Sequence, residues 1–303
     1  MKKFKDFVKS KKSGVSRIPH PHEMYVAVIH HGSHSQVRDK SSSKRSSSKK
    51  KKVTEETKYD DIDEIFDSLT RNAHGISDYN TEPLMRQLAA HPSIDTDNNP
   101  YADQFKNYTS SSYNMNNSLY EHHLRGMYGD DGYHPDMLKH VLLRGKMNLP
   151  RMDHAVHYGS APNDLTVFSG LSWEPPKIIG GKPNKIFLPS FTSTSLNAGI
   201  TSDFMNQRPV NVGERQILNQ HLAQFHVPSG TPIGVPGHGF SENSHEHEAI
   251  LARGLVTRWG EPEIRTSVDY DPILKKEYET RVHVHPVHIE DVAVHPRNFK
   301  PIT

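Results

Sequence analysis

The feature that most constrains the fold of this chain is a change, along the sequence, in how its apolar residues are spaced. Up to about residue 158, apolar residues recur at three- and four-residue spacing, which is typical of amphipathic helices. After Pro162, short apolar runs are separated by Gly and Pro, which is typical of strands and turns. Helices first and strands afterwards, without regular alternation of the two, predict an α+β domain.

The expected elements follow from these spacings. Helices are predicted over residues 62–73, 82–91, 111–126, 135–146 and 151–158, and strands within residues 165–170, 185–195, 221–231, 248–254 and 280–289. The sequence therefore predicts a basic arm over residues 1–55, a helical lead-in over 56–100 and a main domain over 101–303.

Basic charge is gathered at the N-terminal end. Residues 1–52 hold 15 Lys and Arg against 3 acidic residues, while the remainder holds 22 against 32. The run "RDKSSSKRSSSKKKK", Arg38 to Lys52, offers too little apolar surface to offset the entropy of ordering, so we expect it to be disordered. Basic arms bind nucleic acid by counterion release, but no aromatic side chains interleave these lysines. Nucleic-acid binding and a solvated tail both remain open for residues 1–52.

Composition and spacing exclude several other classes of protein. The chain has no cysteine, which rules out disulfides and thiolate metal sites and favours an intracellular compartment. The basic beginning is not followed by an apolar stretch, and no later segment approaches the length of a membrane span, so we expect neither a secretory signal nor a membrane partner. His247 and Glu248 begin a zinc-protease motif, but Leu251 stands where its second histidine belongs, and we expect no metal.

Two glutamates, Glu246 and Glu248, flank His247 in the segment "SHEHEAILARG". Residues two apart share one face of a strand, so we expect the two carboxylates to project side by side. Like charges at that distance raise one another's pKa, which makes chance a poor reason for the pair. Taken alone, however, a charged strand end is the simpler interpretation.

Four further segments change that balance. In chain order, the five segments are "YTSSSYNMNNSL" from Tyr108, "LTVFSGLSW" from Leu165, "FTSTSL" from Phe191, "FHVPSGT" from Phe225, and the E-x-E pair. Together they resemble the NAD-dependent mono-ADP-ribosyltransferases, and within that family the arginine-specific enzymes with an R-S-E pattern, found in clostridial binary toxins and phage Alt and Mod types. The resemblance, which spans Tyr108 to Gly254, implies the ADP-ribosyltransferase fold, with N-terminal helices followed by a two-sheet β core.

The resemblance also implies roles for particular residues. Glu248 is the catalytic glutamate, Glu246 serves the acceptor, and the Ser193 hydroxyl belongs to the motif that holds the catalytic glutamate. The remaining NAD-binding positions that it implies are Tyr108, Tyr113, Ser169, Gly170, Thr194, Ser195, Phe204 and Arg208. In the family, the two tyrosines lie over the nicotinamide end of NAD, and the aromatic residue at the position of Phe204 packs on nicotinamide.

Two positions depart from the family pattern. Ser169 stands where the family has an arginine that contacts the NAD phosphates, and a second family arginine falls on Gln207, beside Arg208. A diphosphate still needs compensating positive charge. The candidates that remain open are Arg208, Lys177, Lys182 and Arg151.

The implied chemistry gives each carboxylate a task. Cleavage of the ribose–nicotinamide bond passes through an oxocarbenium-like state, which a fixed carboxylate stabilises. A guanidinium is nearly inert as an acceptor until a second carboxylate orients or deprotonates it. We therefore expect an enzyme that uses NAD as its substrate and modifies exposed arginines of a host protein. Because the chain has neither a secretory signal nor cysteine, we expect this enzyme to be encoded by a phage, carried in the virion and active in the host cytoplasm. The alternative is a catalytically inactive relative that binds nucleic acid or builds a virion, which a measurement of nicotinamide release separates.

Overall fold

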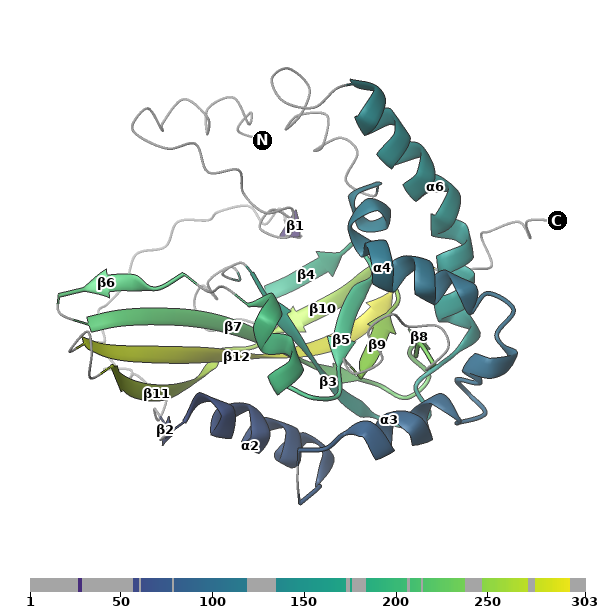
Figure 1. Ribbon diagram of the computed structural model, residues 1–303. Coiled ribbons are helices and arrows are strands. Elements are labelled where there is room, and N and C mark those ends of the chain that lie inside the picture. Colours follow the sequence, from purple (N-terminus) through teal and green to yellow (C-terminus); the bar gives the residue numbers. More distant parts are fainter. Residues whose placement is uncertain are drawn as a thin grey trace, which may run out of the picture.

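The computed structural model describes residues 27–28, 57–59, 61–77, 79–118, 135–172, 175, 184–205, 208–213, 215–237, 247–271 and 276–294. The Ser/Lys-rich run and Glu246 lie outside these residues. Helices come first and a large mixed sheet follows, which confirms the α+β prediction (Figure 1). No helix in the described ranges is both long and apolar enough to cross a membrane.

The first two helices match the predicted ranges closely. Helix α2 (Ile62–His74) begins after Asp61, whose side chain accepts a hydrogen bond from the Asp63 N–H, as N-cap residues commonly do. It ends at Gly75, whose φ of 65° is a left-handed conformation that glycine adopts without steric cost. Helix α3 (Glu82–Ala89) carries a proline in its first turn, where the missing N–H costs nothing.

The next helices differ from the prediction at two points, and the first is that the helix predicted from residue 111 already begins at Asp103. After the short turn η2 (Thr96–Asn98) come α4 (Asp103–Ser118) and α6 (Pro135–Tyr158). The two helices predicted over 135–146 and 151–158 are one continuous helix that contains Pro150, so the predicted gap over residues 147–150 is wrong. Met152, Ala155 and Val156, on the far side of the proline, are fully buried, and this burial supports a continuous helix against the proline's local cost.

The strands form a sheet that is hydrogen-bonded in the order β1-β4-β10-β12-β7-β3-β5-β9-β8, with β11 and β2 attached to β12 and β6 attached to β7. Their bounds are β1 (Ala27–Val28), β2 (Thr57–Tyr59), β3 (Leu165–Leu171), β4 (Asn184–Leu188), β5 (Thr192–Ser195), β6 (Val210–Val212), β7 (Arg215–Val227), β8 (Ile233–Gly234), β9 (Glu248–Leu251), β10 (Leu255–Trp259), β11 (Glu263–Asp271) and β12 (Lys276–Val292). The pair β7–β12 is parallel, and so is β11–β2; the other pairs are antiparallel.

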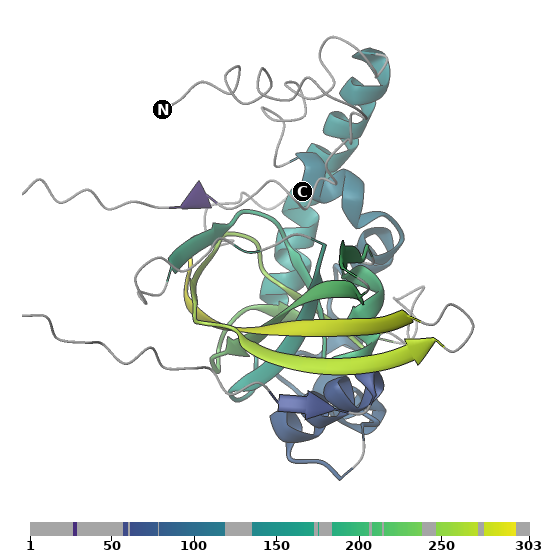
Figure 2. The same cartoon turned by 90° about the vertical axis from the view of Figure 1, so that its left-hand side faces the viewer.

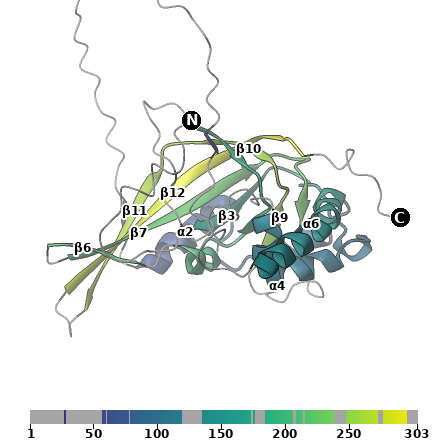
Figure 3. The ribbon, with the colours of Figure 1, turned by 90° about the horizontal axis from the view of Figure 1, so that it is seen from above.

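The two sheets that were expected are joined into one continuous hydrogen-bonded sheet, which has two parts. Between β3 and β5 the pairing narrows to a single position, where Phe168 lies opposite Ser195. On one side of that junction, β7 and β12 run together for eleven paired residues and project beyond the helices with β6 and β11 (Figures 1 and 3). On the other side lie the short strands β5, β9 and β8.

Helices cover the sheet in two places. Figure 2 shows α2 and α3 on one side of the strands and α4 and α6 on the other. Helix α2 packs Ile65, Phe66 and Leu69 against Phe168 and Leu222 of the sheet. Helices α3, α4 and α6 share a second buried cluster with β7, β9 and the residues that flank β5, Phe191 and Leu196. The predicted lead-in helices therefore share their core with the strands that follow.

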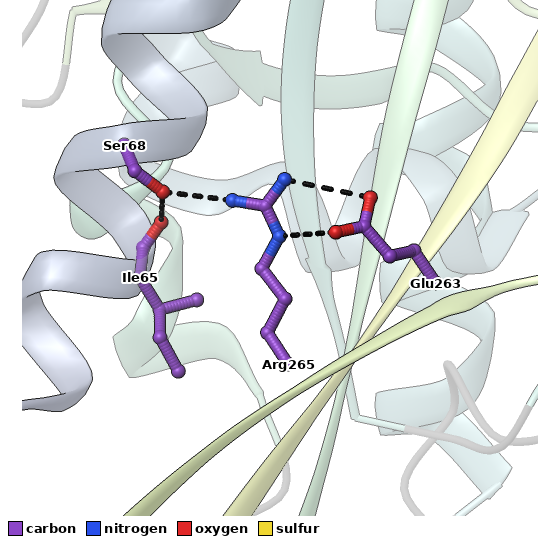
Figure 4. A network of polar contacts seen from close by, with 4 residues as sticks. All are labelled: Ile65, Ser68, Glu263 and Arg265. Carbon is purple, nitrogen blue, oxygen red and sulfur yellow. Dashed lines mark hydrogen bonds and ion pairs between the residues drawn. The ribbon is translucent and has the colours of Figure 1, made fainter. Parts of the chain in front are cut away.

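A buried arginine fixes α2 against β11. Arg265, on β11, donates two hydrogen bonds to the Glu263 carboxylate and one, of 2.7 Å, to the Ser68 hydroxyl (Figure 4). The Ser68 hydroxyl in turn donates to the carbonyl oxygen of Ile65 within α2. Because a guanidinium presents several donors in a rigid plane, this one side chain ties the orientation of the helix to the strand.

Candidate active site

Three of the five segments that resemble the transferase motifs lie on adjacent strands. Strands β3, β5 and β9 are neighbours in the sheet, and Glu248, the first residue of β9, lies opposite Ser195 of β5. Ser195 is also the residue opposite Phe168 of β3. Directly opposed residues share a face of a sheet, so Glu248 projects from the same face as Ser195 and Ser193. One carboxylate oxygen of Glu248, Oε2, is buried.

The Ser-Thr-Ser hydroxyls act mainly on the backbone of the strands. Thr194, which points to the opposite face, donates to the carbonyl oxygen of Ala249 at 2.5 Å. The Ser195 hydroxyl accepts the N–H of Asn197 at 3.0 Å and so shapes the turn after β5. These bonds fix β5 against β9, and through that pairing they fix where Glu248 begins its strand.

Tyr108 holds Ser193 from within the core. The Ser193 hydroxyl donates to the Tyr108 hydroxyl at 3.2 Å, which also accepts from Asn116 and donates to the carbonyl oxygen of Phe191. The Tyr108 side chain is only 1% exposed and packs edge-on against the ring of Phe191. In this structure its ring has no free face for nicotinamide, so its contribution to the site is to position Ser193 and β5.

Ser169 joins the same network. Its hydroxyl donates to the carbonyl oxygen of Ser193 at 3.0 Å, one residue along from the single backbone pair between β3 and β5. The hydroxyl therefore adds a second link at the narrowest point of the sheet. A serine here serves the strands, whereas the family's arginine at this position contacts phosphate.

Gly170 and Phe204, two of the NAD-binding positions that the resemblance implies, lie close together. The turn η3 (Gly199–Phe204) crosses β3 so closely that a Cβ at Gly170 would lie 2.2 Å from the carbonyl oxygen of Thr201 and 3.2 Å from the Cβ of Phe204. Only glycine allows this approach. The Phe204 side chain is 55% exposed, which leaves an aromatic ring free to stack on a ligand beside β3.

The side-by-side geometry predicted for the paired glutamates stays a prediction, because the structure describes only one member of the pair, Glu248. Strand β9 begins at Glu248, and the preceding residue, His247, has a φ of 47°. A left-handed residue interrupts the alternation of a strand, so the regular geometry of β9 begins at Glu248. Glu246 itself lies outside the described residues, and its distance from Glu248 stays open.

For the remaining predicted residues, the structure gives an element or an exposure but no contact with the site. Tyr113 lies on α4, but its side chain is outside the described part of the structure. Arg208 is exposed and lies between η3 and β6, on the chain that follows Phe204. Arg151 is exposed on α6, and Lys177 and Lys182 lie outside the described residues.

Helices α2 and α3 make contacts beside the site that the sequence did not predict. Thr81, at the start of α3, forms a 2.7 Å hydrogen bond with Nδ1 of His247, next to Glu248. His74, at the end of α2, bonds through Nε2 to the carbonyl oxygen of Leu196, next to Ser195. Burial lowers the pKa of His74, and this backbone bond partly opposes the shift. No local spacing marks these residues, because their partners are more than one hundred positions away.

Metal binding has no support in the residues that can be placed. The described ranges contain no group of three or more His, Asp or Glu side chains that could hold a metal ion.

Comparisons with known proteins give structural likenesses only. No protein-family model matches the chain, and no curated protein matches it. Among solved structures, it resembles C3stau2 of S. aureus, determined with NAD, at 16% identity and a TM-score of 0.35 over 76% of this chain and 99% of that one. It also resembles Plx2a, an ADP-ribosyltransferase toxin of Paenibacillus larvae, at 15% identity and a TM-score of 0.38 over 67% and 95% of the two chains. A third is C2-I, the enzymatic component of the C2-toxin of Clostridium botulinum, at 15% identity and a TM-score of 0.43 over 69% of this chain and 48% of that one.

Proposed function

We propose that this chain is a NAD-dependent mono-ADP-ribosyltransferase that modifies arginine side chains of a host protein. The observation that carries the proposal is the position of Glu248 opposite Ser195, at the point where the E-x-E and Ser-Thr-Ser segments meet on adjacent strands. These segments lie 53 positions apart in the chain, yet their register brings the serine and the glutamate onto one face. The host acceptor, a phage origin and nucleic-acid binding by residues 1–52 are parts of the same proposal.

The donor half of the reaction needs a fixed negative charge beside the ribose. When the ribose–nicotinamide bond breaks, positive charge develops on the sugar, and a preorganised carboxylate stabilises it. Glu248 suits this role because the start of its strand is held by the β5 pairing, by the Thr194 bond to Ala249 and by the Ser193–Tyr108 network behind it. Such support reduces the reorganisation that the charge would otherwise require.

The binding half is supported by an aromatic ring and a glycine. Phe204 offers an exposed face beside β3, and Gly170 lets η3 approach the strand closely enough to hold that ring there. Nicotinamide is a flat aromatic group that stacks on such a surface. The exposed Ser193 lies on the face that Glu248 shares.

The acceptor half rests on Glu246. A guanidinium has a pKa above about 12, so a second carboxylate must orient it or remove a proton before it attacks the ribose. Water needs less orientation than a guanidinium and can intercept the same cation. Loss of Glu246 should therefore separate transfer to arginine from hydrolysis of NAD.

The test is a paired assay on purified variants, with nicotinamide release measured beside label transfer to an arginine-rich protein. We expect Glu248→Gln to lower both activities by about 10²- to 10³-fold, since a preorganised charge is lost. We expect Glu246→Gln to abolish transfer and leave hydrolysis largely intact. Glu261→Gln, an exposed glutamate outside the site, is the matched control and should change neither rate.

Two results would contradict the proposal at different points. Full activity of Glu248→Gln would remove Glu248 from the reaction and with it the transferase assignment. Equal loss of transfer and hydrolysis in Glu246→Gln would leave the assignment in place and remove the division of labour between the two glutamates.

A further inference from the structure

The residue that leads into the proposed catalytic strand has an unfavourable backbone conformation. His247 has a φ of 47°, in the left-handed region where a side chain with a Cβ crowds the backbone. The next residue, Glu248, begins β9. A conformation of this kind persists only where the surrounding structure enforces it, and such residues cluster at functional sites.

The contact that enforces it comes from the start of α3. The Thr81 hydroxyl and His247 Nδ1 form a 2.7 Å hydrogen bond, and Thr81 is fully buried. Thr81 occupies the N-cap position of α3, where a threonine hydroxyl usually bonds the helix's own N–H groups. Here it makes no such cap bond, and the Asn80 side chain instead accepts the N–H of Glu82. The hydroxyl of Thr81 is thus committed to His247.

The same helical segment also holds the partner strand. The His74 bond to Leu196 (2.8 Å), the Thr70 hydroxyl accepting from the Ala198 N–H (3.0 Å) and the Asn197 side chain donating to Tyr79 (3.1 Å) all fix the turn after Ser195. Across the sheet, the Leu196 N–H bonds the carbonyl oxygen of His247 at 3.4 Å. The neighbours of both members of the Ser195–Glu248 pair are therefore held by α2 and α3.

We propose that Thr81 is a positioning residue for Glu248: through its bond to His247, it fixes the backbone angle at which Glu248 enters β9 and so the direction of its carboxylate. This inference rests on the proposed function. A carboxylate displaced by a fraction of an ångström stabilises the developing charge less well, while substrate binding by other residues is unaffected. The consequence is a lower turnover with a nearly unchanged Michaelis constant for NAD.

The experiment compares Thr81→Val, which keeps the shape and removes the hydroxyl, with Thr81→Ser, which restores it. We expect Thr81→Val to lower the kcat of nicotinamide release about 10- to 100-fold with little change in KM, and Thr81→Ser to recover most of the loss. Thr257→Val is the matched control, because Thr257 on β10 is also buried and its hydroxyl donates at 2.8 Å to the carbonyl oxygen of Ile186 on β4, several strands away from β9 in the sheet. It should leave kcat unchanged.

Two further measurements separate positioning from general weakening of the fold. His247→Asn keeps a residue that tolerates a left-handed backbone, and Thr81→Val should add nothing to its loss of kcat, because both changes break one link. Amide hydrogen exchange of residues 247–251 should speed up in Thr81→Val and not in Thr257→Val.

Additive effects on kcat, or unchanged exchange at the start of β9, would overturn the inference. The exchange result does not depend on activity, so it decides the matter even if the chain fails to cleave NAD. Conversely, an active wild type with an inactive Glu248→Gln and a fully active Thr81→Val would leave the proposed function standing and remove only the role of Thr81.

Discussion

At the scale of single residues, hydroxyl groups do much of the work of holding the proposed site. Thr194 binds β5 to β9, Ser169 binds β3 to β5, and Tyr108 binds α4 to β5. Each replaces or supplements a backbone hydrogen bond where the sheet is narrow. Because the Ser169 hydroxyl is committed to the Ser193 carbonyl, the compensating charge for a diphosphate has to come from another side chain.

Arg208 is the first candidate for that positive charge. It is the described candidate that lies nearest in sequence to Phe204. We expect Arg208→Ala to raise the KM for NAD several-fold with little change in kcat, since a charge-assisted contact to the diphosphate acts in both the bound and the transition state. Steady-state nicotinamide release over a range of NAD concentrations measures both constants. Arg258→Ala, which removes an exposed arginine that pairs with Glu290 on another part of the sheet, serves as the control. An unchanged KM in Arg208→Ala would transfer the role to Lys177, Lys182 or Arg151.

The residues that motif spacing selected lie in different environments in the structure. Gly170 and Phe204 lie together because one needs the absence of a side chain and the other follows at the end of the turn that crosses it. Tyr108 was expected over a ligand, but its aromatic ring gains more from burial beside Phe191. The paired glutamates were placed by strand alternation, which ends at His247 because its backbone is left-handed. Tertiary contacts such as Thr81–His247 leave no local pattern.

At the scale of elements, strand β9, which begins with the proposed catalytic Glu248, is also anchored at its far end. Arg253, two residues after β9, donates hydrogen bonds of 2.7 and 2.8 Å to the two carboxylate oxygens of Asp153 on α6. The Asp153 side chain is fully buried, and burial raises its pKa while the Arg253 guanidinium opposes the shift. The pair thus connects α6 to the strand that begins with Glu248.

Breaking this pair should cost far more than breaking an exposed one. In Arg253→Met, the Asp153 charge stays buried without its partner, and we expect a loss of about 3–5 kcal/mol in the free energy of unfolding, partly recovered by adding Asp153→Asn. Arg258→Met removes one partner of the more exposed Arg258–Glu290 pair and should cost less than about 1 kcal/mol. Urea denaturation of the four proteins measures the differences. Equal losses in the two single variants would show that Asp153 is not an uncompensated buried charge.

Elements with regular apolar spacing could be predicted, and those without it could not. The spacing of Ile65, Phe66 and Leu69 predicted α2, and the same pattern placed them in the core. Strand β11 was missed because its buried residues, Arg265, Thr266 and Ser267, are all polar, and Arg265 is satisfied by Glu263 and Ser68 rather than by apolar neighbours. Apolar spacing predicted two helices with a gap over residues 147–150, whereas α6 continues through Pro150 because residues beyond the proline are buried.

At the scale of the whole molecule, the N-terminal arm and the folded body should separate in function. Strand β1 pairs with β4 through Ala27 and Val28, so deleting residues 1–52 also removes a strand from the sheet edge. Replacing only the Lys and Arg of residues 38–52 by Gln leaves β1 in place and is the sharper variant. We expect it to weaken nucleic-acid binding and flatten its salt dependence, with nicotinamide release unchanged. Binding titrations at several salt concentrations test this, and binding that does not change would leave the arm as a solvated tail.

The long strands β7 and β12 carry a cluster of stacked histidines. His221 lies opposite His283 in the parallel pair, its Nδ1 lies 3.1 Å from Nε2 of His285, and all three rings stack. Trp259 packs beside His285, and Asn219 hydrogen-bonds His283. Burial, and then the neighbouring His283, lower the pKa of His221 to about 4. Burial, and then His221 and His283, lower the pKa of His285 to about 3.

These shifts predict that acid destabilises the fold well before the carboxylates titrate. A histidine whose folded pKa lies below its unfolded value of about 6.5 is held neutral by folding, so its contribution is complete above pH 6.5 and is lost as the pH falls toward its folded pKa. Between pH 6.5 and 4, each such group should reduce the free energy of unfolding by up to about 1.4 kcal/mol per pH unit. We expect His285→Gln, which keeps a polar group beside His221, to show a shallower decline than the wild type in urea denaturation between pH 7.5 and 4.5. His91→Gln, at an exposed histidine, should decline as the wild type does. A wild-type slope in His285→Gln would mean that His285 is not held neutral by the sheet.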